Sequence, residues 1–195
     1  MTESLPIAPV LRWLYNAPEV AWRNGGGLTR ELLAAPAGDA WRWRISVAEV
    51  SSDGPFSSYP GVERWIALIE GAGMELDFDG KVQRRLQNHT PLRFDGARAP
   101  TCRLLAGPTQ DLNLMLRGID GGMQRARPNA PWAPRGRQAG LYTVGPCTLH
   151  SDAGRWLVSA DHLAWFTQVP KRLWVEAPDT VVAWWLSVDD TQEAA

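Results

Sequence analysis

The sequence has little cysteine and no paired histidines. Two cysteines occur among 195 residues, too few for a disulfide framework, which favours a reducing compartment. His89, His150 and His162 lie more than four residues apart, so no His-x-His or His-x-x-x-His pair exists. Because a catalytic zinc usually has three protein ligands, often histidines, we expect no metal site, and nothing in the sequence calls for another cofactor.

Long apolar runs and an excess of charge of one sign are also missing. The longest apolar run, Val181–Leu186, is far shorter than the roughly 20 residues of a membrane helix. The first nine residues lack the basic start and apolar stretch of a signal peptide. The net charge is −1, from 20 basic and 21 acidic residues, which argues against a nucleic-acid binder. We therefore expect a cytoplasmic protein that binds neither membrane nor nucleic acid, and a homodimer is left open.

Helical patterns are scarce, whereas strand patterns are frequent. The 15 prolines and 18 glycines are spread along the chain and leave little room for long helices. Trp41–Val47 alternates strictly, which predicts a half-buried strand. Met74–Phe78 alternates before Asp79-Gly80, a pair that favours a tight hairpin. Other runs recur every 8–12 residues or so, as in a sandwich or barrel. These runs are Val10–Tyr15, Leu28–Ala34, Val62–Glu70, Lys81–Leu86, Thr101–Ala106, Asp111–Arg117, Leu141–Val144, Arg155–Ser159, Leu163–Thr167, Arg172–Val175 and Val181–Val188.

One stretch interrupts the strand pattern. Residues 118–137 are rich in glycine and proline, as is usual for loops and linkers. We interpret them as a linker or crossover. It divides an all-β chain into an N-terminal lobe, residues 1–117, and a C-terminal lobe, residues 138–195.

Cysteine and tryptophan are interpreted as core residues. The chain has 11 tryptophans, and Trp174, Trp184 and Trp185 lie in C-terminal strands among Val and Leu, which predicts burial rather than a sugar-binding face. Cys102 precedes Arg103 on a predicted strand, so the two side chains point to opposite faces. We expect an inert buried thiol and no catalytic nucleophile.

Two loops are candidates for the border of a ligand site. Three consecutive glycines, Gly25–Gly27, could present backbone amides to an anion or form a tight turn. No Lys-Ser/Thr pair and no helix follow them, which argues against nucleotide binding and favours the turn. Ser51–Gly61 is either a loop at a barrel mouth, with Ser57 and Tyr59 as contacts, or a plain connection between strands.

Polar residues also occupy one face of several predicted strands. This set comprises Arg44, Ser46, Glu49, Arg64, Asp111 and Asn113. A solvated face is the ordinary explanation for each residue alone. In a closed barrel one face points into the lumen, and its polar groups then become ligand contacts. The sequence does not decide which face points inward.

Five blocks, in this order and spacing, resemble the HutD/Ves family of bacterial proteins. The similarity covers residues 8–125. The blocks are Trp22–Thr29, Trp43–Val50, Asp53–Ser57, Pro60–Arg64 and Leu104–Pro108 with Asp111–Met115. The resemblance implies a bicupin fold, that is, two cupin-type β-barrel lobes in one chain. It also implies a regulatory role in histidine utilisation by sensing of a pathway intermediate, whereas the name Ves is attached to a stress-related role.

An empty barrel with inward arginines would suit a small carboxylate, because arginine binds carboxylates through two parallel hydrogen bonds. Urocanate and formyl-glutamate, intermediates of histidine breakdown, are carboxylates. We expect Arg44 and Arg64 to be the main contacts. The expected secondary contacts are Asn24, Thr29, Ser46, Ser57 and Asn113. The alternative is that both arginines are solvated or paired with Glu49 and Glu63 on the outside.

Three functions remain in competition. The first is a non-enzymatic, ligand-sensing regulatory protein with no catalytic residues. The second is an enzyme acting on a small organic acid, for which Glu31, Glu49, Glu63 or Asp111 would have to serve as general acid or base. The third is an interaction protein of a stress response. A pocket lined by convergent polar groups favours the first two, and a filled barrel with a large exposed apolar patch favours the third.

Overall fold

The protein is all-β, as predicted. The computed structural model describes residues 7–80 and 82–192. Within these ranges the chain forms strands and one short 3-10 turn, η1 (Leu14–Asn16), and no α-helix. No helix in this part of the chain has the length and hydropathy needed to cross a membrane.

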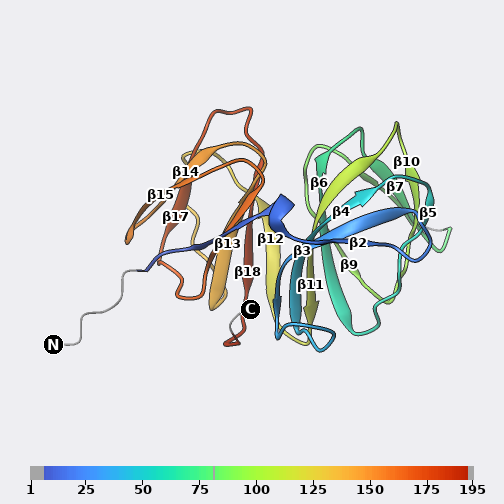
Figure 1. The fold of residues 1–195 in the computed structure, drawn as a ribbon, viewed down its shortest axis with the longest axis horizontal. Helices are drawn as coiled ribbons and strands as arrows, with labels where there is room; N and C mark the ends of the chain where they lie inside the picture. The colour runs from blue at the N-terminus through green and yellow to red at the C-terminus, as the bar shows by residue number, and fades with distance from the viewer. Residues whose placement is uncertain (1–6, 81, 193–195) are drawn as a thin grey trace.

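Two sheets form the right-hand half of the molecule in Figure 1. The six-stranded sheet consists, in spatial order, of β2 (Glu19–Ala21), β3 (Gly27–Ala35), β4 (Trp43–Val50), β11 (Thr109–Arg117), β6 (Val62–Glu70) and β9 (Leu92–Asp95). The four-stranded sheet consists of β5 (Gly54–Pro55), β10 (Thr101–Leu104), β7 (Met74–Phe78) and β8 (Val82–Leu86). The pairings within both sheets are antiparallel.

Two further sheets form the other half (Figure 1). The five-stranded sheet consists of β1 (Val10–Trp13), β16 (His162–Phe166), β13 (Gln138–Thr143), β18 (Ala183–Val188) and β12 (Gly121–Arg125). The three-stranded sheet consists of β15 (Gly154–Val158), β14 (Cys147–Ser151) and β17 (Leu173–Glu176).

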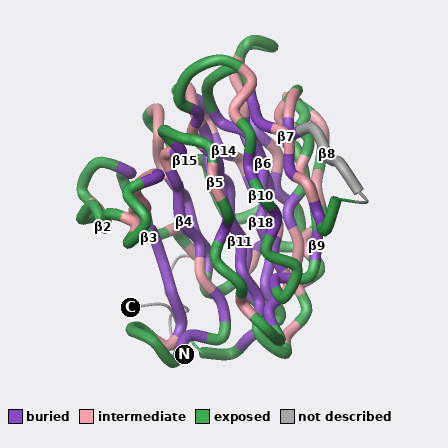
Figure 2. Tube along the Cα trace, turned by 90° about the vertical axis from the view of Figure 1, so that its right-hand side faces the viewer, coloured by how far each residue is buried: buried purple, intermediate pink, exposed green. Residues whose placement is uncertain are grey.

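Three hydrophobic clusters join the four sheets as layers. The first lies between the six-stranded and five-stranded sheets, where Trp43 packs against Trp165 with ring centroids 5.2 Å apart. The second fills the space between the five-stranded and three-stranded sheets, and the third lies between the six-stranded and four-stranded sheets. The two middle sheets are therefore covered on both faces, and in Figure 2 the buried stretches run along strands such as β4.

Strand β4 differs from its predicted half-buried state. Trp43, Ile45 and Val47 project into the first cluster, as the alternation predicted. On the opposite face, however, Ser46 is only 1% exposed and Arg44 is partly buried. The polar face is thus enclosed rather than solvated, because the chain folds back over it.

The expected hairpin and most predicted strands are present. Phe78 pairs with Val82 across a turn in which Asp79 and Gly80 have φ of 63° and 66°, the left-handed values that Asp-Gly favours. Lys81, which was included in the predicted strand, lies outside the described residues. Strands β2, β5, β9, β12 and β14 were not predicted, and β5 lies in the stretch interpreted as a loop.

Two strands, β1 and β12, depart from the predicted division of the chain into two lobes. Strand β12 lies within residues 118–137 and pairs with β18, so that stretch is not a connection throughout. Strand β1, from the predicted N-terminal lobe, pairs with β16 of the other half. No described sheet closes on itself through its own hydrogen bonds. The division at 118–137 stays a prediction.

The predicted core residues are buried with one exception. Trp184 and Trp185 are at most 1% exposed, whereas Trp174 is only partly buried and stacks on His150 at 5.2 Å. Cys102 is 1% exposed and its neighbour Arg103 points outward to Glu75. Burial raises the pKa of the Cys102 thiol to about 12, which agrees with an inert thiol.

Candidate ligand pocket

A pocket of about 690 Å³ opens over the face of the six-stranded sheet that also carries the third cluster. Strands β2, β3, β4, β6 and β11 contribute side chains to it, as do the β2–β3 turn and the loop after β5. All seven residues that the sequence singled out as ligand contacts line this one pocket. They are Asn24, Thr29, Arg44, Ser46, Ser57, Arg64 and Asn113.

Strand register places the central polar residues in rows. Arg44 on β4 and Arg64 on β6 both pair with Met115 on β11, which lies between them. In the next row Ser46 pairs with Asn113. Directly paired residues of neighbouring strands project from the same face. These five side chains therefore share the face that borders the pocket.

The Arg64 guanidinium is buried among aromatic rings. Arg64 is 7% exposed, and its Cζ lies 5.1 Å from the ring centroid of Phe94, 5.4 Å from that of Phe56 and 5.6 Å from that of Tyr59. Burial, which outweighs the opposing charge of Asp111, lowers the pKa of Arg64 from 12.5 to about 10. The group therefore stays positively charged at neutral pH and is held by ring faces, while its Nε has no protein partner.

Arg44 is closer to the pocket mouth. Its side chain is 21% exposed, and its Nε lies 3.9 Å from a carboxylate oxygen of Glu31, which is beyond hydrogen-bonding distance. Its Nη2 lies 3.4 Å from the sulfur of Met115, and its Cζ lies 5.4 Å from the Trp41 ring. None of these contacts is a close charge-assisted hydrogen bond, so the guanidinium keeps most of its capacity for an anion.

The alternative in which both arginines are solvated or paired with Glu49 and Glu63 on the outside is not what the structure shows. Glu63 pairs with Arg93 and accepts a hydrogen bond of 2.8 Å from Trp65. Arg64 is turned inward, as its low exposure shows.

A chain of three side chains runs from Arg64 into the sheet. Arg64 Nη2 donates to Asn113 Oδ1 at 3.2 Å, and Asn113 Nδ2 donates to Asp111 Oδ1 at 2.5 Å. Asp111 pairs with Ala48 one row beyond Ser46 and is 1% exposed. Burial raises the pKa of Asp111 to about 7, although the hydrogen bond from Asn113 and the charge of Arg64 both act to lower it.

The β2–β3 turn closes one side of the pocket. Trp22 N donates to the carbonyl oxygen of Gly27 at 2.9 Å, and the amide of Gly25, which has φ of 71°, donates to the carbonyl oxygen of Trp22 at 3.0 Å. Asn24 Oδ1 accepts the Gly26 amide at 3.1 Å. The glycines thus form the structural turn that the sequence favoured, and this turn presents Asn24 to the pocket.

Thr29 and Ser57 lie at the sides of the pocket. Thr29 Oγ1 accepts a hydrogen bond of 2.8 Å from Trp22 Nε1. Ser57 is exposed on the loop after β5, which is fixed where the amide of Phe56 donates to the carbonyl oxygen of Pro100 at 2.9 Å. The loop therefore lies at the pocket mouth instead of only joining strands.

Buried polar atoms without a partner gather in this pocket. Eight such side-chain atoms occur in the described part of the chain. Four of them belong to pocket-lining residues: Arg44 Nε, Ser46 Oγ, Arg64 Nε and Asp111 Oδ2. A buried donor or acceptor left unsatisfied costs about 1–3 kcal/mol. Their concentration at one place indicates a site that a bound molecule or water completes.

Sequence reasoning missed several lining residues. Trp22, Arg23, Phe56 and Met115 line the pocket without having been assigned to it. Of the four carboxylates considered for acid–base chemistry, Glu31 and Asp111 line the pocket, Glu63 lines a different recess and Glu49 lines neither. The alternation of residues along β4, β6 and β11 could have identified Met115, which lies between Arg44 and Arg64.

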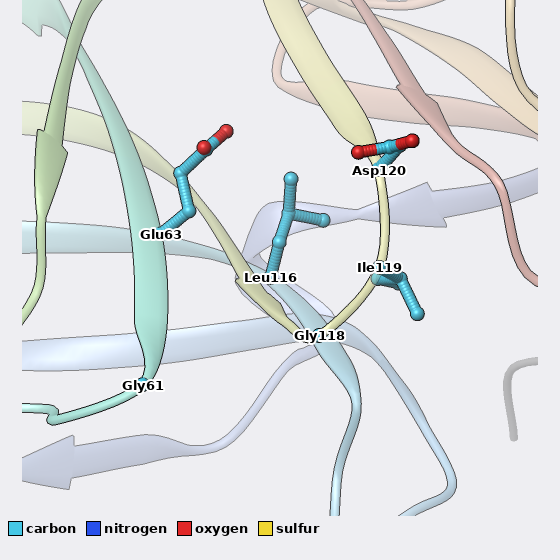
Figure 3. Close-up of a pocket in the computed structure, with 6 residues that line it drawn as sticks. All are labelled: Gly61, Glu63, Leu116, Gly118, Ile119 and Asp120. Atoms are coloured by element: carbon cyan, nitrogen blue, oxygen red, sulfur yellow. The ribbon is translucent and has the colours of Figure 1, made fainter.

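A second recess of about 340 Å³ lies next to the junction of β11 and β12. It is shallow, and Figure 3 shows the carboxylates of Glu63 and Asp120 on opposite sides of Leu116. Glu63 already pairs with Arg93. One partly buried and one exposed carboxylate around an aliphatic side chain offer little to an anion, so the larger pocket is the better candidate.

The three histidines occupy separate places. His89 and His162 each contact a backbone carbonyl oxygen through Nδ1 at 2.8 Å, and His150 contacts Glu176 at 2.9 Å. Among the described residues no group of three His, Cys, Asp or Glu side chains is arranged to hold a metal ion. The absence of a metal stays a prediction.

Comparison with protein families shows which family the chain belongs to. The HutD family model matches residues 15–181, which extends the similarity well beyond residue 125. The chain belongs to the HutD family. Family membership was predicted from the five sequence blocks and is confirmed.

Two relatives illustrate how far the HutD similarity extends. An uncharacterized 21.2 kDa protein in the hutC 3′ region of Pseudomonas putida is 34% identical over 117 residues, 59% of each chain. Protein Ves of Citrobacter koseri is 39% identical over 102 residues, 51% of this chain and 53% of that protein. The chain thus spans little more than half the length of the curated relatives it matches.

Solved structures extend the comparison to the whole fold. HutD from Pseudomonas fluorescens SBW25, determined in a formate condition, aligns with a TM-score of 0.79 and 25% identity over 94% of this chain and all of that one. Oxalate decarboxylase from Bacillus subtilis aligns with a TM-score of 0.65 and 10% identity over all of this chain and 81% of that one. The second likeness concerns the fold alone, and the HutD fold is accordingly cupin-like.

Proposed function

We propose that this HutD family protein binds a small carboxylate in the large pocket and acts as a non-enzymatic regulatory protein of histidine utilisation. One observation carries the proposal. Two arginines, Arg44 and Arg64, line one pocket in which buried polar atoms lack protein partners. Guanidinium groups bind carboxylates through parallel charge-assisted hydrogen bonds, so an anion would satisfy the donors that the protein leaves open.

The proposed ligands are intermediates of histidine breakdown, urocanate or formyl-glutamate. The pocket volume of about 690 Å³ lies within the usual range for small-molecule sites. Both ligands carry a carboxylate for the arginines and further polar atoms for Ser46, Asn113 or Asn24. The name of the Pseudomonas putida relative refers to hutC, which supports this pathway.

A second candidate function is an enzyme acting on a small organic acid. The observation that favours it is Asp111, a buried carboxyl in the pocket with one oxygen unpartnered and a pKa of about 7. Such a group could act as general acid or base. A stress-response interaction role gains less support, because the pocket is open and polar rather than filled.

We also propose that the sheets form two cupin-type lobes in one chain. The third cluster and the pocket belong to the six-stranded and four-stranded sheets, and the second cluster belongs to the five-stranded and three-stranded sheets. In this proposal the first cluster is the interface between the lobes, and β1 is a strand that the N-terminal segment adds to the other lobe.

Isothermal titration calorimetry with urocanate and N-formyl-L-glutamate tests the proposal. We expect at least one acid to bind with a stoichiometry near one. NMR spectra of the same mixtures, followed for hours, separate the two candidates, since a binding protein leaves the acid unchanged and an enzyme converts it. The proposal is wrong if neither acid binds at millimolar concentration.

A further inference from the structure

Asp111 is a buried carboxyl in the pocket, and its place in an anion site is unexpected. A carboxylate next to a bound carboxylate would repel it, yet Asp111 lines the pocket and is 1% exposed. Its two oxygens differ. Oδ1 accepts a hydrogen bond of 2.5 Å from Asn113, whereas Oδ2 is buried without a partner.

Asn113 separates Asp111 from Arg64. The amide accepts from Arg64 at 3.2 Å on one side and donates to Asp111 on the other. The Asp111 carboxyl therefore lacks a direct charge-assisted hydrogen bond from the guanidinium, the contact that would most favour its ionised form. Burial is left as the dominant influence, and it raises the pKa of Asp111 to about 7.

The titratable and charged groups around Asp111 come from four strands, one turn and one loop. They are Arg23 in the β2–β3 turn, Glu31 on β3, Arg44 on β4, Arg64 on β6, Cys102 on β10 and Tyr59 in the loop after β5. The Cys102 thiol, with a pKa of about 12, stays neutral near pH 7. The pKa of about 7 places the change in charge of Asp111 near neutral pH.

The charge balance of the pocket depends on that proton. With Asp111 ionised, the three lining arginines, Arg23, Arg44 and Arg64, face the two carboxylates of Glu31 and Asp111, which leaves one net positive charge. With Asp111 protonated, the lining carries two net positive charges, and Oδ2–H becomes a donor for which the protein offers no acceptor. A carboxylate ligand thus interacts better with the protonated state, because that state adds both positive charge and a hydrogen-bond donor.

We propose that Asp111 is a ligand-contacting residue of this pocket and that it holds the anion as a carboxylic acid, donating through Oδ2. This inference rests on the proposed carboxylate binding. One proton moves from solvent to Asp111 Oδ2 when the anion binds above neutral pH, and it returns to solvent when the anion leaves. The site then selects acids that offer an acceptor to Arg44 or Arg64 and another to Asp111, and its affinity depends on pH.

Calorimetry with N-formyl-L-glutamate tests this, because the carboxyls of that probe do not titrate near neutral pH. Titrations at pH 8 in phosphate and in Tris, which differ in ionisation enthalpy, give the number of protons taken up. We expect close to one proton per ligand at pH 8 and close to none at pH 5.5. The affinity should fall up to about tenfold per pH unit above pH 7, the limit for one linked proton.

Two variants sharpen the test. Asp111→Asn should take up no proton and should bring the ratio of affinities at pH 6 and pH 8 close to one. Asp120→Asn, which changes a carboxyl in the separate shallow recess, should keep the proton count of the unaltered protein. The proton count of the unaltered protein decides the question even if Asp111→Asn is unstable.

The outcomes distinguish this inference from the proposed function. Binding of the probe at pH 8 without proton uptake would overturn the role of Asp111 alone. Proton uptake that persists in Asp111→Asn would do the same and would point to another group. If the unaltered protein binds neither N-formyl-L-glutamate nor urocanate at either pH, the proposed function and this inference are both overturned.

Discussion

Arg44 and Arg64 lie on either side of Met115, and each pairs directly with it across the six-stranded sheet. Because strands lie about 4.8 Å apart, the two arginine backbones are about 10 Å apart on one face. The side chains extend from this spacing toward one pocket. Two guanidinium groups held apart by a thioether can serve one carboxylate from two sides or two carboxylates of one ligand.

Loss of either arginine should weaken carboxylate binding. A hydrogen bond to a charged group contributes about 1.5–3 kcal/mol, so Arg44→Ala and Arg64→Ala should each raise Kd about 10- to 150-fold. Arg64→Lys keeps the charge but loses the planar pair of donors. Its Kd should therefore lie between those of the unaltered protein and Arg64→Ala. Calorimetry with urocanate and N-formyl-L-glutamate measures all three.

The control for this series is Arg103→Ala. Arg103 is exposed, pairs with Glu75 and lies outside the pocket, so its loss should leave Kd unchanged. Thermal unfolding of each variant checks that the fold persists. If the Arg44 and Arg64 variants bind as tightly as the unaltered protein, the anion lies elsewhere.

Glu31 should limit the affinity for an anion. Its carboxylate lies 3.9 Å from Arg44 Nε and its side chain is 45% exposed. A partly exposed ion pair of this kind is worth about 0.2–1 kcal/mol. Glu31→Gln should therefore lower Kd by up to about fivefold, with less effect at high salt because salt screens exposed charges. Glu63→Gln, outside the pocket, is the matched control, and an unchanged or higher Kd for Glu31→Gln would contradict the assignment.

The predicted pocket residues that lie on strands were accessible to sequence reasoning because they follow strand periodicity. Arg44 and Ser46 are two residues apart on one strand, so they share a face. The sequence could not show which face of the six-stranded sheet borders the pocket, since both faces are covered. One face is covered by the five-stranded sheet, whose strands are distant in sequence.

Strand β12 and the register shift in β3 could not be predicted from the sequence, because local residue patterns do not indicate them. Strand β12 begins Gly121-Gly122, a pattern usually typical of a loop, yet a Cβ at Gly121 would come within 2.6 Å of the Ser187 carbonyl oxygen. Glycine is needed there for close backbone approach. In β3 a register shift between Glu31 and Leu33 interrupts the alternation, and a bulge of this kind has no reliable sequence signal.

Gly27 should be intolerant of a side chain. A Cβ at this position would lie 2.2 Å from the carbonyl oxygen of Glu49, where β3 pairs with β4 beside the pocket. Gly27→Ala should destabilise the protein by about 1–3 kcal/mol, the usual cost of forcing atoms into a packed site. Gly26→Ala, whose nearest contact would be Ser52 Oγ at 3.3 Å, should cost less. Urea unfolding compares them, and equal stability of the two variants would show that the β3–β4 contact can open.

Asp111 should make folding stability depend on pH. Its pKa is raised from 3.8 to about 7 in the folded protein by burial. The unfolded chain therefore ionises first, and the contribution of this group to stability is complete below about pH 4 and is lost as pH rises toward 7. The loss amounts to at most about 4 kcal/mol, since one pKa unit corresponds to about 1.4 kcal/mol. Asp111→Asn lacks the ionisation, so it should gain stability relative to the unaltered protein between pH 4 and 7. Urea unfolding of both proteins across this range isolates the effect, and a difference in free energy of unfolding that is constant with pH would show that Asp111 ionises normally in the fold.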